Sequence, residues 1–577
     1  MKDLLITTAI SEKVKKEQKI YLLSNWCNTL EMQENLKYNN VKVFPYHWKS
    51  KNKFNKDYYY LNHLYELNLK ILANILGKYN KTSQEINYWR IIIGPWLRQF
   101  SDIAFDRYSQ IANATKKENL YTNIIDCNLD NLISSNFKDF YFQSKKDLWN
   151  HNLIGIIWKE LGLSYKNISK RDIPIEKKNN SFQLIFKNYI NKIGFGIQEN
   201  NNYIFHCTNI SFKRLLKINF KLMQFPVKTY ELNEYKFSDK VFSNIRKEIK
   251  KNLYQSNQFE IILAKLICIY MPRIYLEDFQ INKSHVLKRL PNNPKKIFTT
   301  HAYLRDDLFK IWVAEKKISN KAKYFIIQHG GCIRTCKFDQ EEEHFVNSCD
   351  GFISWGWDLK NKQIINWLPS LQLENQIVRN NNKGDIMIIM ASYPRYFYIH
   401  YSVPISDDYL DYLENIEYLF KKINILNNQK VKIRFAKEDS GWENEKRLSK
   451  RLKYFKKDDN SLPIKQSLKK SKLAFCTANS TVFLETLSYN FPTLVFIDLR
   501  FYEIREDVLQ DFTNLNKVGI CFFDIDSALD HLSNINNDII KWWYSNDLQA
   551  AREVFIKKFA NTSNQYLDKW SKFIKKI

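Results

Sequence analysis

Apolar and polar positions alternate most regularly in the second half of the chain. Apolar runs at 296–300 (KIFTT) and 324–328 (YFIIQ) have the length of buried strands, and residues 304–317 between them carry apolar side chains at helical spacing. A strand, a helix and a strand in this order form a βαβ unit, in which the two strands are parallel. The pattern therefore predicts a parallel α/β domain, which the apolar segment 352–357 (FISWGW) continues.

A second series begins after a polar segment at 371–384, which ends in an asparagine cluster and has the composition of a linker. This series predicts a second parallel α/β domain. Two such domains joined by one linker face each other across a cleft, and ligands of parallel sheets bind beyond the carboxyl ends of the strands. The predicted strands are 385–390, 431–436, 473–476 and 493–497, and the predicted helices are 410–426 and 480–489.

The N-terminal half carries additional helix. Leucines and isoleucines recur at helical spacing over 58–79, and the segment 88–100 is apolar and aromatic. Short strands are predicted in the opening apolar run, at 19–23 and at 41–44. The predicted fold class is therefore α/β, with two Rossmann-like parallel domains facing across a cleft and extra helices in the N-terminal half. The predicted boundaries are 1–375, 385–545 and a closing helical segment at 546–577.

Charge and cysteine content narrow the class of protein. The chain has 89 Lys and Arg against 61 Asp and Glu, a net charge of +28, which indicates either an anionic partner or a compositional bias, since lysine, asparagine and isoleucine are abundant throughout. The lysines are scattered, whereas a nucleic-acid-binding protein needs a clustered basic face. Nine widely spread cysteines, an odd number, predict no disulfide framework and a cytoplasmic location. The apolar run after Met1 is too short for a signal peptide.

The stretch QHGG at 328–331 directly follows a predicted buried strand. The chain contains only 13 glycines, so a pair beside a histidine is conspicuous. Gly330 and Gly331 would allow a tight turn and expose backbone N–H groups to an anion. His329 would then face the cleft, where it would donate a hydrogen bond to phosphate or act as a general base. A histidine that is simply hydrogen-bonded at the end of a strand is the alternative.

The stretch CTANSTVFLETLSYNFP at 476–492 predicts a strand, a polar loop and a helix. Asn479, Ser480 and Thr481 stand where the helix begins, and a helix N-terminus is suited to bind phosphate. Glu485 would lie one turn above the hydroxyls, where a carboxylate can accept a hydrogen bond from a ribose hydroxyl. A plain capped helix is the alternative.

These motifs carry a resemblance. The S-T-x-x-x-E-x-L-x-x-x-x-P pattern resembles the donor-binding helix of GT-B glycosyltransferases, and the strand with QHG resembles that of capsule (Kdo-type) glycosyltransferases and CDP-glycerol glycerophosphotransferases. Several further segments, such as WRIIIGPWL at 89–97 and IRFAKEDSGW at 433–442, are similar to those of transferases encoded among bacterial surface-carbohydrate genes. The resemblance implies a GT-B fold. The donor nucleotide or its phosphate would contact Gln328, His329, Gly330, Gly331, Asn479, Ser480, Thr481 and Glu485.

The remaining candidates are a base and two cations. A direct displacement needs a group to take the acceptor proton, and Glu342, from the acidic run 339–343 close to QHGG, is our candidate. Arg395, after the first strand of the second domain, is shaped to bind phosphate or carboxylate. Related transferases often carry a His-Pro pair after the strand at 431–436. Lys437 and Glu438 stand there instead, and Lys437 or Arg434 would supply the missing positive charge.

The sequence predicts that no metal or other cofactor is needed. Cys332, Cys336, His344 and Cys349 do not have the spacing of a common zinc site, and no D-x-D, P-loop or dinucleotide motif is present.

The predicted function is therefore that of an inverting, metal-independent glycosyltransferase. It would use a nucleotide-sugar donor and a surface-polysaccharide or lipid-linked glycan acceptor, with peripheral contact to an anionic membrane. The donor could be a hexosyl or a Kdo-type sugar. The alternatives are a glycerol- or ribitol-phosphate transferase of cell-surface polymer synthesis and a basic nucleic-acid-binding protein, although we expect no nucleic-acid partner.

Overall fold

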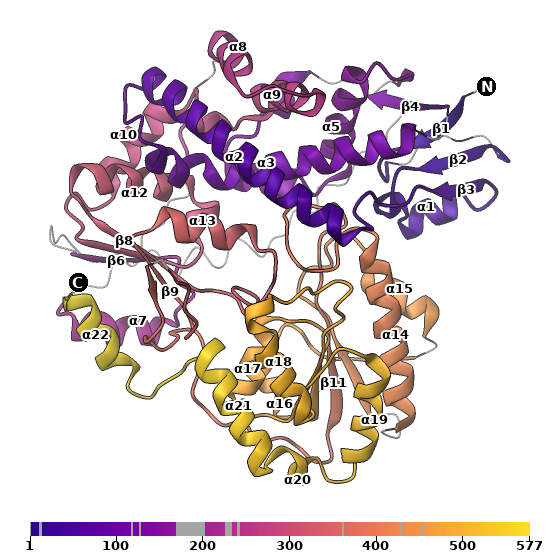
Figure 1. The fold of residues 1–577 in the computed structure, drawn as a ribbon, viewed down its shortest axis with the longest axis vertical. Coiled ribbons are helices and arrows are strands. Elements are labelled where there is room, and N and C mark those ends of the chain that lie inside the picture. Colours follow the sequence, from indigo (N-terminus) through magenta and orange to yellow (C-terminus); the bar gives the residue numbers. More distant parts are fainter. Residues whose placement is uncertain are drawn as a thin grey trace.

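The described part of the chain folds around three parallel β-sheets with helices packed on them (Figure 1). This computed structural model describes residues 2–10, 14, 16–116, 119–125, 128–168, 202–224, 234–238, 243–360, 363–426, 430–452 and 454–576. The strand pairs of all three sheets are parallel. The predicted α/β class with parallel sheets is confirmed.

The first sheet has the order β3-β2-β1-β4-β5. The strand order therefore reverses between β1 and β4, as in Rossmann-like sheets. Its strands are β1 (Asp3–Ile6), β2 (Lys19–Leu22), β3 (Asn40–Val43), β4 (Leu120–Ile125) and β5 (Tyr165–Ile168). Its helices are α1 (Leu30–Asn35), α2 (Lys51–Tyr79), α3 (Ile86–Thr115), α4 (Phe137–Gln143) and α5 (Asp147–Glu160).

The second sheet has the order β10-β9-β8-β7-β6 and no reversal. The predicted βαβ unit is present here as β7, α12 and β8. The strands are β6 (Tyr203–His206), β7 (Lys296–Thr299), β8 (Lys323–Ile327), β9 (Gly351–Ile353) and β10 (Ile364–Ile365). The helices are α7 (Phe212–Lys221), α8 (Ser243–Asn252), α9 (Gln258–Tyr270), α10 (Phe279–Arg289), α11 (Ala302–Arg305), α12 (Asp307–Ser319) and α13 (Gln340–Ser348).

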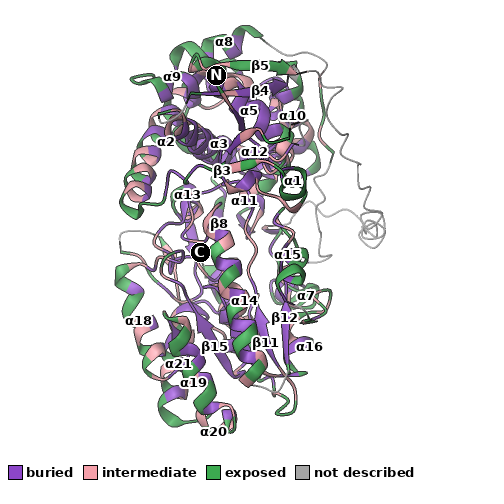
Figure 2. Ribbon diagram, turned by 90° about the vertical axis from the view of Figure 1, so that its right-hand side faces the viewer, coloured by how far each residue is buried: buried purple, intermediate pink, exposed green. Residues whose placement is uncertain are grey.

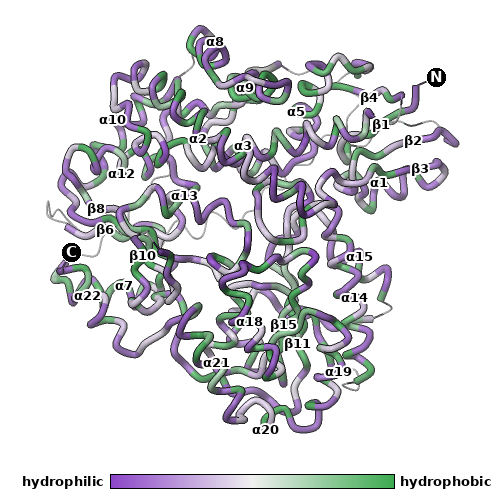
Figure 3. The backbone as a smooth tube through the Cα atoms, in the orientation of Figure 1, coloured by the Kyte–Doolittle hydropathy of each residue, from purple (hydrophilic) through white to green (hydrophobic). Residues whose placement is uncertain are grey.

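The third sheet has the order β13-β12-β11-β14-β15-β16, which reverses between β11 and β14. Its central strands are strongly hydrophobic (Figure 3). The strands are β11 (Asp385–Ile389), β12 (Val431–Arg434), β13 (Lys456–Lys457), β14 (Ser471–Cys476), β15 (Thr493–Phe496) and β16 (Cys521–Phe522). The helices are α14 (Asp408–Leu426), α15 (Asn444–Arg451), α16 (Ile464–Leu468), α17 (Thr481–Ser488), α18 (Glu506–Lys517), α19 (Ile525–Ile535) and α20 (Ile539–Trp543).

The C-terminal segment divides into two helices with different partners. α21 (Asn546–Phe559) packs on α17 and α18 of the third sheet. α22 (Tyr566–Lys576) instead reaches the second sheet, beside α7 (Figure 1). There Trp570 and Phe573 join a core cluster with Phe298 and Phe325, and the Trp570 indole donates a hydrogen bond to the Pro369 carbonyl (2.8 Å).

The range 1–375, which was predicted as one domain, contains two sheets. The strands of the first sheet are four to six residues long, and α2 and α3, with 29 and 30 residues, separate β3 from β4. α3 is buried along most of its length, while the outer helices expose one face to solvent (Figure 2). A helix buried on all sides has no amphipathic period, so the pattern over 88–100 indicated packing without showing its helical extent.

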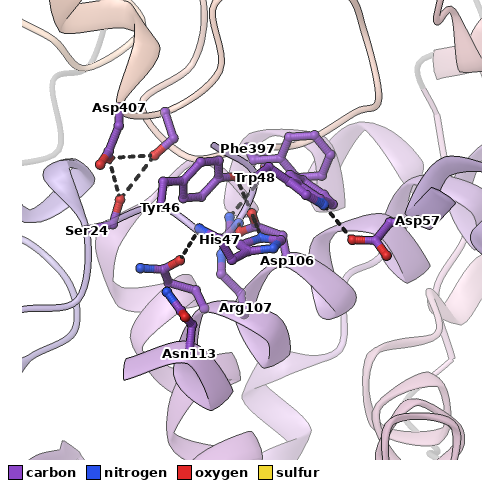
Figure 4. Close-up of polar contacts among 12 residues, drawn as sticks. Ser24, Tyr46, His47, Trp48, Asp57, Asp106, Arg107, Asn113, Phe397 and Asp407 are labelled. Carbon is purple, nitrogen blue, oxygen red and sulfur yellow. Dashed lines mark hydrogen bonds and ion pairs between the residues drawn. The ribbon is translucent and has the colours of Figure 1, made fainter. Parts of the chain in front are cut away.

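A buried polar network joins the first sheet to loops of the third (Figure 4). The Ser24 hydroxyl donates to Asp407 (2.6 Å), and the Arg107 guanidinium donates to the Phe397 carbonyl (3.0 Å). Asp106 accepts from Tyr46 and pairs with His47 and Arg107. Removing one partner from a buried hydrogen bond destabilises the folded protein. This network therefore fixes the two sheets relative to each other.

None of the helices that the structure describes has the length and apolar character needed to cross a bilayer.

Candidate functional site

The QHGG loop and the start of α17, 150 residues apart in sequence, are in direct contact. The Gly331 N–H donates a hydrogen bond to the Thr481 hydroxyl (3.1 Å). A Cβ atom on Gly331 would lie 2.7 Å from the carbonyl carbon and oxygen of Ser480. The loop follows β8 of the second sheet, and α17 follows β14 at the point where the strand order of the third sheet reverses. Two motifs singled out in the sequence are therefore in direct contact, although they follow strands of different sheets.

Gln328 positions the QHGG loop. Its side-chain amide donates to the Gly330 carbonyl (2.8 Å), and its oxygen accepts from the Trp355 N–H and the Trp357 indole (both 2.7 Å). The residue is 1% exposed. Both the nitrogen and the oxygen of the Gln328 side-chain amide are hydrogen-bonded within the protein, so Gln328 holds the QHGG loop in place.

His329 is uncharged at neutral pH. Its ring lies 4.4 Å from that of His301, and Nε2 lies 3.9 Å from a carboxylate oxygen of Glu341. Burial, with smaller contributions from His301 and Arg305, lowers the pKa of His329 to about 3. Its Nδ1 has no hydrogen-bond partner among the described residues. A neutral imidazole can donate from one nitrogen and accept at the other, but it brings no charge to a phosphate.

Two neighbouring glutamates of α13 have different surroundings. Glu341 faces His329 and accepts a hydrogen bond from the Tyr303 hydroxyl (3.1 Å). Burial raises the pKa of Glu341, and Arg305 opposes the shift. The Glu342 carboxylate instead pairs with Arg505 (2.9 Å) and accepts from the Arg334 N–H (2.8 Å). The sequence singled out Glu342, but Glu341 is the glutamate that lies beside His329.

The start of α17 offers unused polar groups. Ser480 is the N-cap residue, and its side chain makes no capping hydrogen bond. Asn479 is buried and donates to the Thr335 hydroxyl (2.8 Å), while its side-chain oxygen has no partner in the described part of the chain. The N-terminal N–H groups of a helix carry partial positive charge and have no partner within the helix. The arrangement can therefore accept an anion.

Glu485 lies in the second turn of α17, where the charges of Glu374 and Arg434 act on it. Burial raises the pKa of Glu485 to about 7, and nearby Glu374 adds to the shift while Arg434 opposes it. The carboxyl group therefore changes its charge close to neutral pH.

The two predicted cations do not lie together. The Arg395 side chain is buried, pairs with Asp147 (2.5 Å) and donates to the Trp26 carbonyl. Asp147 also accepts from the Ala9 N–H (2.9 Å), just beyond β1, where the strand order of the first sheet reverses. Arg395 thus fills the crevice of the first sheet. Lys437 is exposed on the loop after β12.

Two cations not singled out in the sequence lie beside Tyr141, and one of them, Arg305, acts on His329. The Arg305 guanidinium lies 4.2 Å from the ring centroid of Tyr141, and Lys145 Nζ lies 3.8 Å from the same centroid. Burial lowers the pKa of Lys145 to about 8, and Glu438 opposes the shift. Arg305 influences both His329 and Glu341. No local motif marks either residue, because the fold brings them in from α11 and the end of α4.

Among the described residues, one group has side chains suited to hold a metal. His206, Cys207 and Asp306 have ligand atoms within 4.8 Å of one another. His206 Nε2 lies 2.8 Å from Asp306. Burial lowers the pKa of His206, but the hydrogen bonds to Asp306 and Cys207 outweigh burial and raise it to about 10. This group is distinct from the cysteines and histidine weighed in the sequence.

Comparison with known proteins gives a family model that matches nearly the whole chain. The model of a family described as LIC12162 family transferase matches residues 3–574. A solved structure titled as the S. aureus MnaA–UDP co-structure has 10% sequence identity and a TM-score of 0.32, with the match covering 65% of this chain and 95% of that chain. A search of curated proteins finds no match.

Proposed function

Because the chain belongs to the LIC12162 family of transferases, we propose that it transfers a sugar from a nucleotide-activated donor to a glycan or glycolipid acceptor. The observation that carries this proposal is the contact between Gly331 and Thr481. It unites a strand-end histidine loop with a helix N-terminus at the carboxyl ends of parallel strands, where nucleotides bind in Rossmann-like sheets. In this proposal the second and third sheets face each other in a GT-B-like manner.

The donor diphosphate or phosphate would bind at the N-terminus of α17. The free Ser480 hydroxyl and the first N–H groups of the helix would donate to its oxygens. Arg305 and Lys145 would neutralise its charge, a task that neutral His329 cannot perform. The Glu485 carboxylate would accept a hydrogen bond from a ribose hydroxyl.

The transfer step needs a base and a leaving group. Glu341 would take the proton of the acceptor hydroxyl while the hydroxyl oxygen attacks the anomeric carbon of the donor sugar. The bond between that carbon and the donor phosphate breaks, and its electron pair leaves with the nucleotide. Neutral His329 would donate a hydrogen bond to the departing phosphate oxygen. Glu342 remains the alternative base, although its carboxylate has two protein partners.

Nucleotide binding tests the donor site. Thermal unfolding should shift upward with one of UDP, CMP, GDP or CDP-glycerol, and the double variant Ser480→Ala, Glu485→Ala should abolish that shift. A matched control is Ser488→Ala, at the far end of the same helix. If no nucleotide stabilises the protein, the proposal fails. Stabilisation by CDP-glycerol alone would favour a glycerol-phosphate transferase.

The net charge of +28 supports contact with an anionic bilayer that carries a lipid-linked acceptor. Co-sedimentation with vesicles of phosphatidylglycerol should be strong at low salt and lost at high salt, and equal binding to neutral phosphatidylcholine vesicles would contradict it.

Turnover should persist in EDTA, because Arg305 and Lys145 provide the countercharge that a divalent ion otherwise supplies.

A further inference from the structure

A narrow pocket is lined in part by Glu341, the carboxylate that lies 3.9 Å from His329. It is enclosed by α2, α3 and α13 and has a volume of about 30 Å³. Glu341 and Tyr303 form the wall that faces the QHGG loop, and Tyr65 and Pro95 contribute apolar surface. A buried water needs about 10–15 Å³, so the pocket has room for about two hydroxyl-sized groups and not for a whole sugar ring.

Four polar nitrogen atoms on residues that line this pocket have no hydrogen-bond partner among the described residues. They are Arg90 Nε, Arg98 Nη2, Gln99 Nε2 and His344 Nδ1. Arg98 is 5% exposed and Gln99 is 2% exposed. Leaving a buried donor unpaired is costly, so several at one place indicate that something polar is bound there.

The backbone of α3 is adapted to bring these groups together. Pro95 stands inside the helix, and Gly94 precedes it. A Cβ atom on Gly94 would lie 2.8 Å from the Tyr65 hydroxyl and 3.1 Å from the ring of His344. A larger residue at position 94 would force the Tyr65 hydroxyl and the His344 ring to shift, and would so change the wall of the pocket.

The charges around the pocket select a neutral, hydroxylated group. Two arginines line it, but Arg90 is held by both oxygens of Glu66 (2.6 and 2.8 Å), and Arg98 pairs with Asp102. Three glutamates also line the pocket. An anion would therefore meet carboxylates without a free countercharge. A hydroxyl group can donate to a carboxylate and accept from an amide or a guanidinium in the same position.

We propose that this pocket is the acceptor subsite, in which vicinal hydroxyls or a hydroxymethyl arm of a neutral sugar bind to Gln99 and Arg98 beside Glu341. The inference rests on the proposed function, because it places the acceptor hydroxyl within reach of the base. Glu341 would then border both sites, since it lies 3.9 Å from His329 and also lines the pocket with Gln99; the acceptor hydroxyl would contact its carboxylate and the anomeric carbon together. The proton moves from the acceptor hydroxyl to Glu341.

Ligand binding to variants of the full chain tests the subsite. The probes are the methyl glycosides of glucose, galactose, mannose and N-acetylglucosamine, detected by saturation-transfer NMR. At least one should bind the wild type. Gln99→Leu should weaken that binding at least tenfold without lowering the unfolding temperature, because the amide nitrogen that it removes is unpaired. Thr481→Val, at the donor site, should leave glycoside binding unchanged and weaken nucleotide binding.

The outcomes separate the subsite from the donor site. If no glycoside binds, or if Gln99→Leu binds as the wild type does, the pocket holds ordered water only and the inference is overturned. If glycosides bind through Gln99 while UDP, CMP, GDP and CDP-glycerol all fail to bind, the acceptor subsite stands and the donor proposal falls. Gln99→Glu adds a second readout, since a carboxylate there would add repulsion beside Glu341 and should also weaken glycoside binding.

Discussion

The contact between the QHGG loop and α17 predicts that two adjacent glycines respond differently to alanine. In Gly331→Ala the new methyl would lie 2.7 Å from the Ser480 carbonyl and 2.8 Å from the Thr481 nitrogen, all backbone atoms that cannot rotate away. In Gly330→Ala the nearest atoms are the Thr481 hydroxyl at 3.9 Å and a methyl of Ile333 at 4.0 Å, which are ordinary contacts. The second variant is therefore a matched control.

The expected magnitude follows from two costs. Overpacking in a close contact costs about 1–3 kcal/mol. Loss of the hydrogen bond from the Gly331 N–H to Thr481 adds about 1 kcal/mol. Gly331→Ala should therefore lower the free energy of unfolding by about 2–4 kcal/mol, while Gly330→Ala should change it by less than about 0.5 kcal/mol.

The assay combines urea unfolding with nucleotide titration. Since a difference of about 1.4 kcal/mol is tenfold in affinity, separating the loop from α17 should weaken binding of the stabilising nucleotide by more than about tenfold. Gly330→Ala should bind it as the wild type does. If the two variants were equally stable and bound the nucleotide equally, the loop and the helix would not form one site.

Three further predictions concern the carboxylates and the joint between sheets. Glu341→Gln should abolish turnover but preserve nucleotide binding, whereas Glu342→Gln should chiefly lower the unfolding temperature; the reverse pattern in kinetics and thermal unfolding would make Glu342 the base. Nucleotide affinity should rise as pH increases through about 7, because the Glu485 carboxyl must lose its proton to accept from ribose, and Glu485→Gln should flatten the profile measured by calorimetry. Arg395→Met should cost about 1.5–3 kcal/mol in urea unfolding, since it removes the charged hydrogen bonds from Arg395 to Asp147 and to the Trp26 carbonyl, and an unchanged midpoint would show that this ion pair does not hold the sheets together.

The sequence predicts most of the strands in the second and third sheets, because short apolar runs separated by amphipathic helices have a clear period. Strands were predicted at 296–300, 324–328 and 385–390; β7 and β11 lie within the first and third of these ranges, and β8 begins one residue before the second. The apolar pattern does not show that the N-terminal half contains two sheets and the whole described chain three. The short strands of the first sheet lie among long helices, and the pairing of β1 with β4 joins segments more than 100 residues apart.

The candidate site was predictable where a motif ends a strand. Gly331 and Thr481 meet as the carboxyl-edge rule for parallel sheets implies. The choice between Glu341 and Glu342 was not predictable, since adjacent helical residues point about 100° apart and the acidic run does not show which of them faces the cleft. Arg395 was expected at phosphate, but a strand-end arginine can equally pair across to another sheet, and its partner Asp147 is distant in sequence.

The position of α22 has a consequence for how the chain is made. Phe298 and Phe325 of the second sheet pack against Trp570 and Phe573, which are synthesised more than 200 residues after them. During synthesis this sheet must therefore wait, with part of its apolar face uncovered, until more than 200 further residues have been added. A stop codon just before Tyr566 would leave that face bare in the finished protein. Such a truncation should therefore produce aggregation during expression, long before any effect on catalysis could be measured.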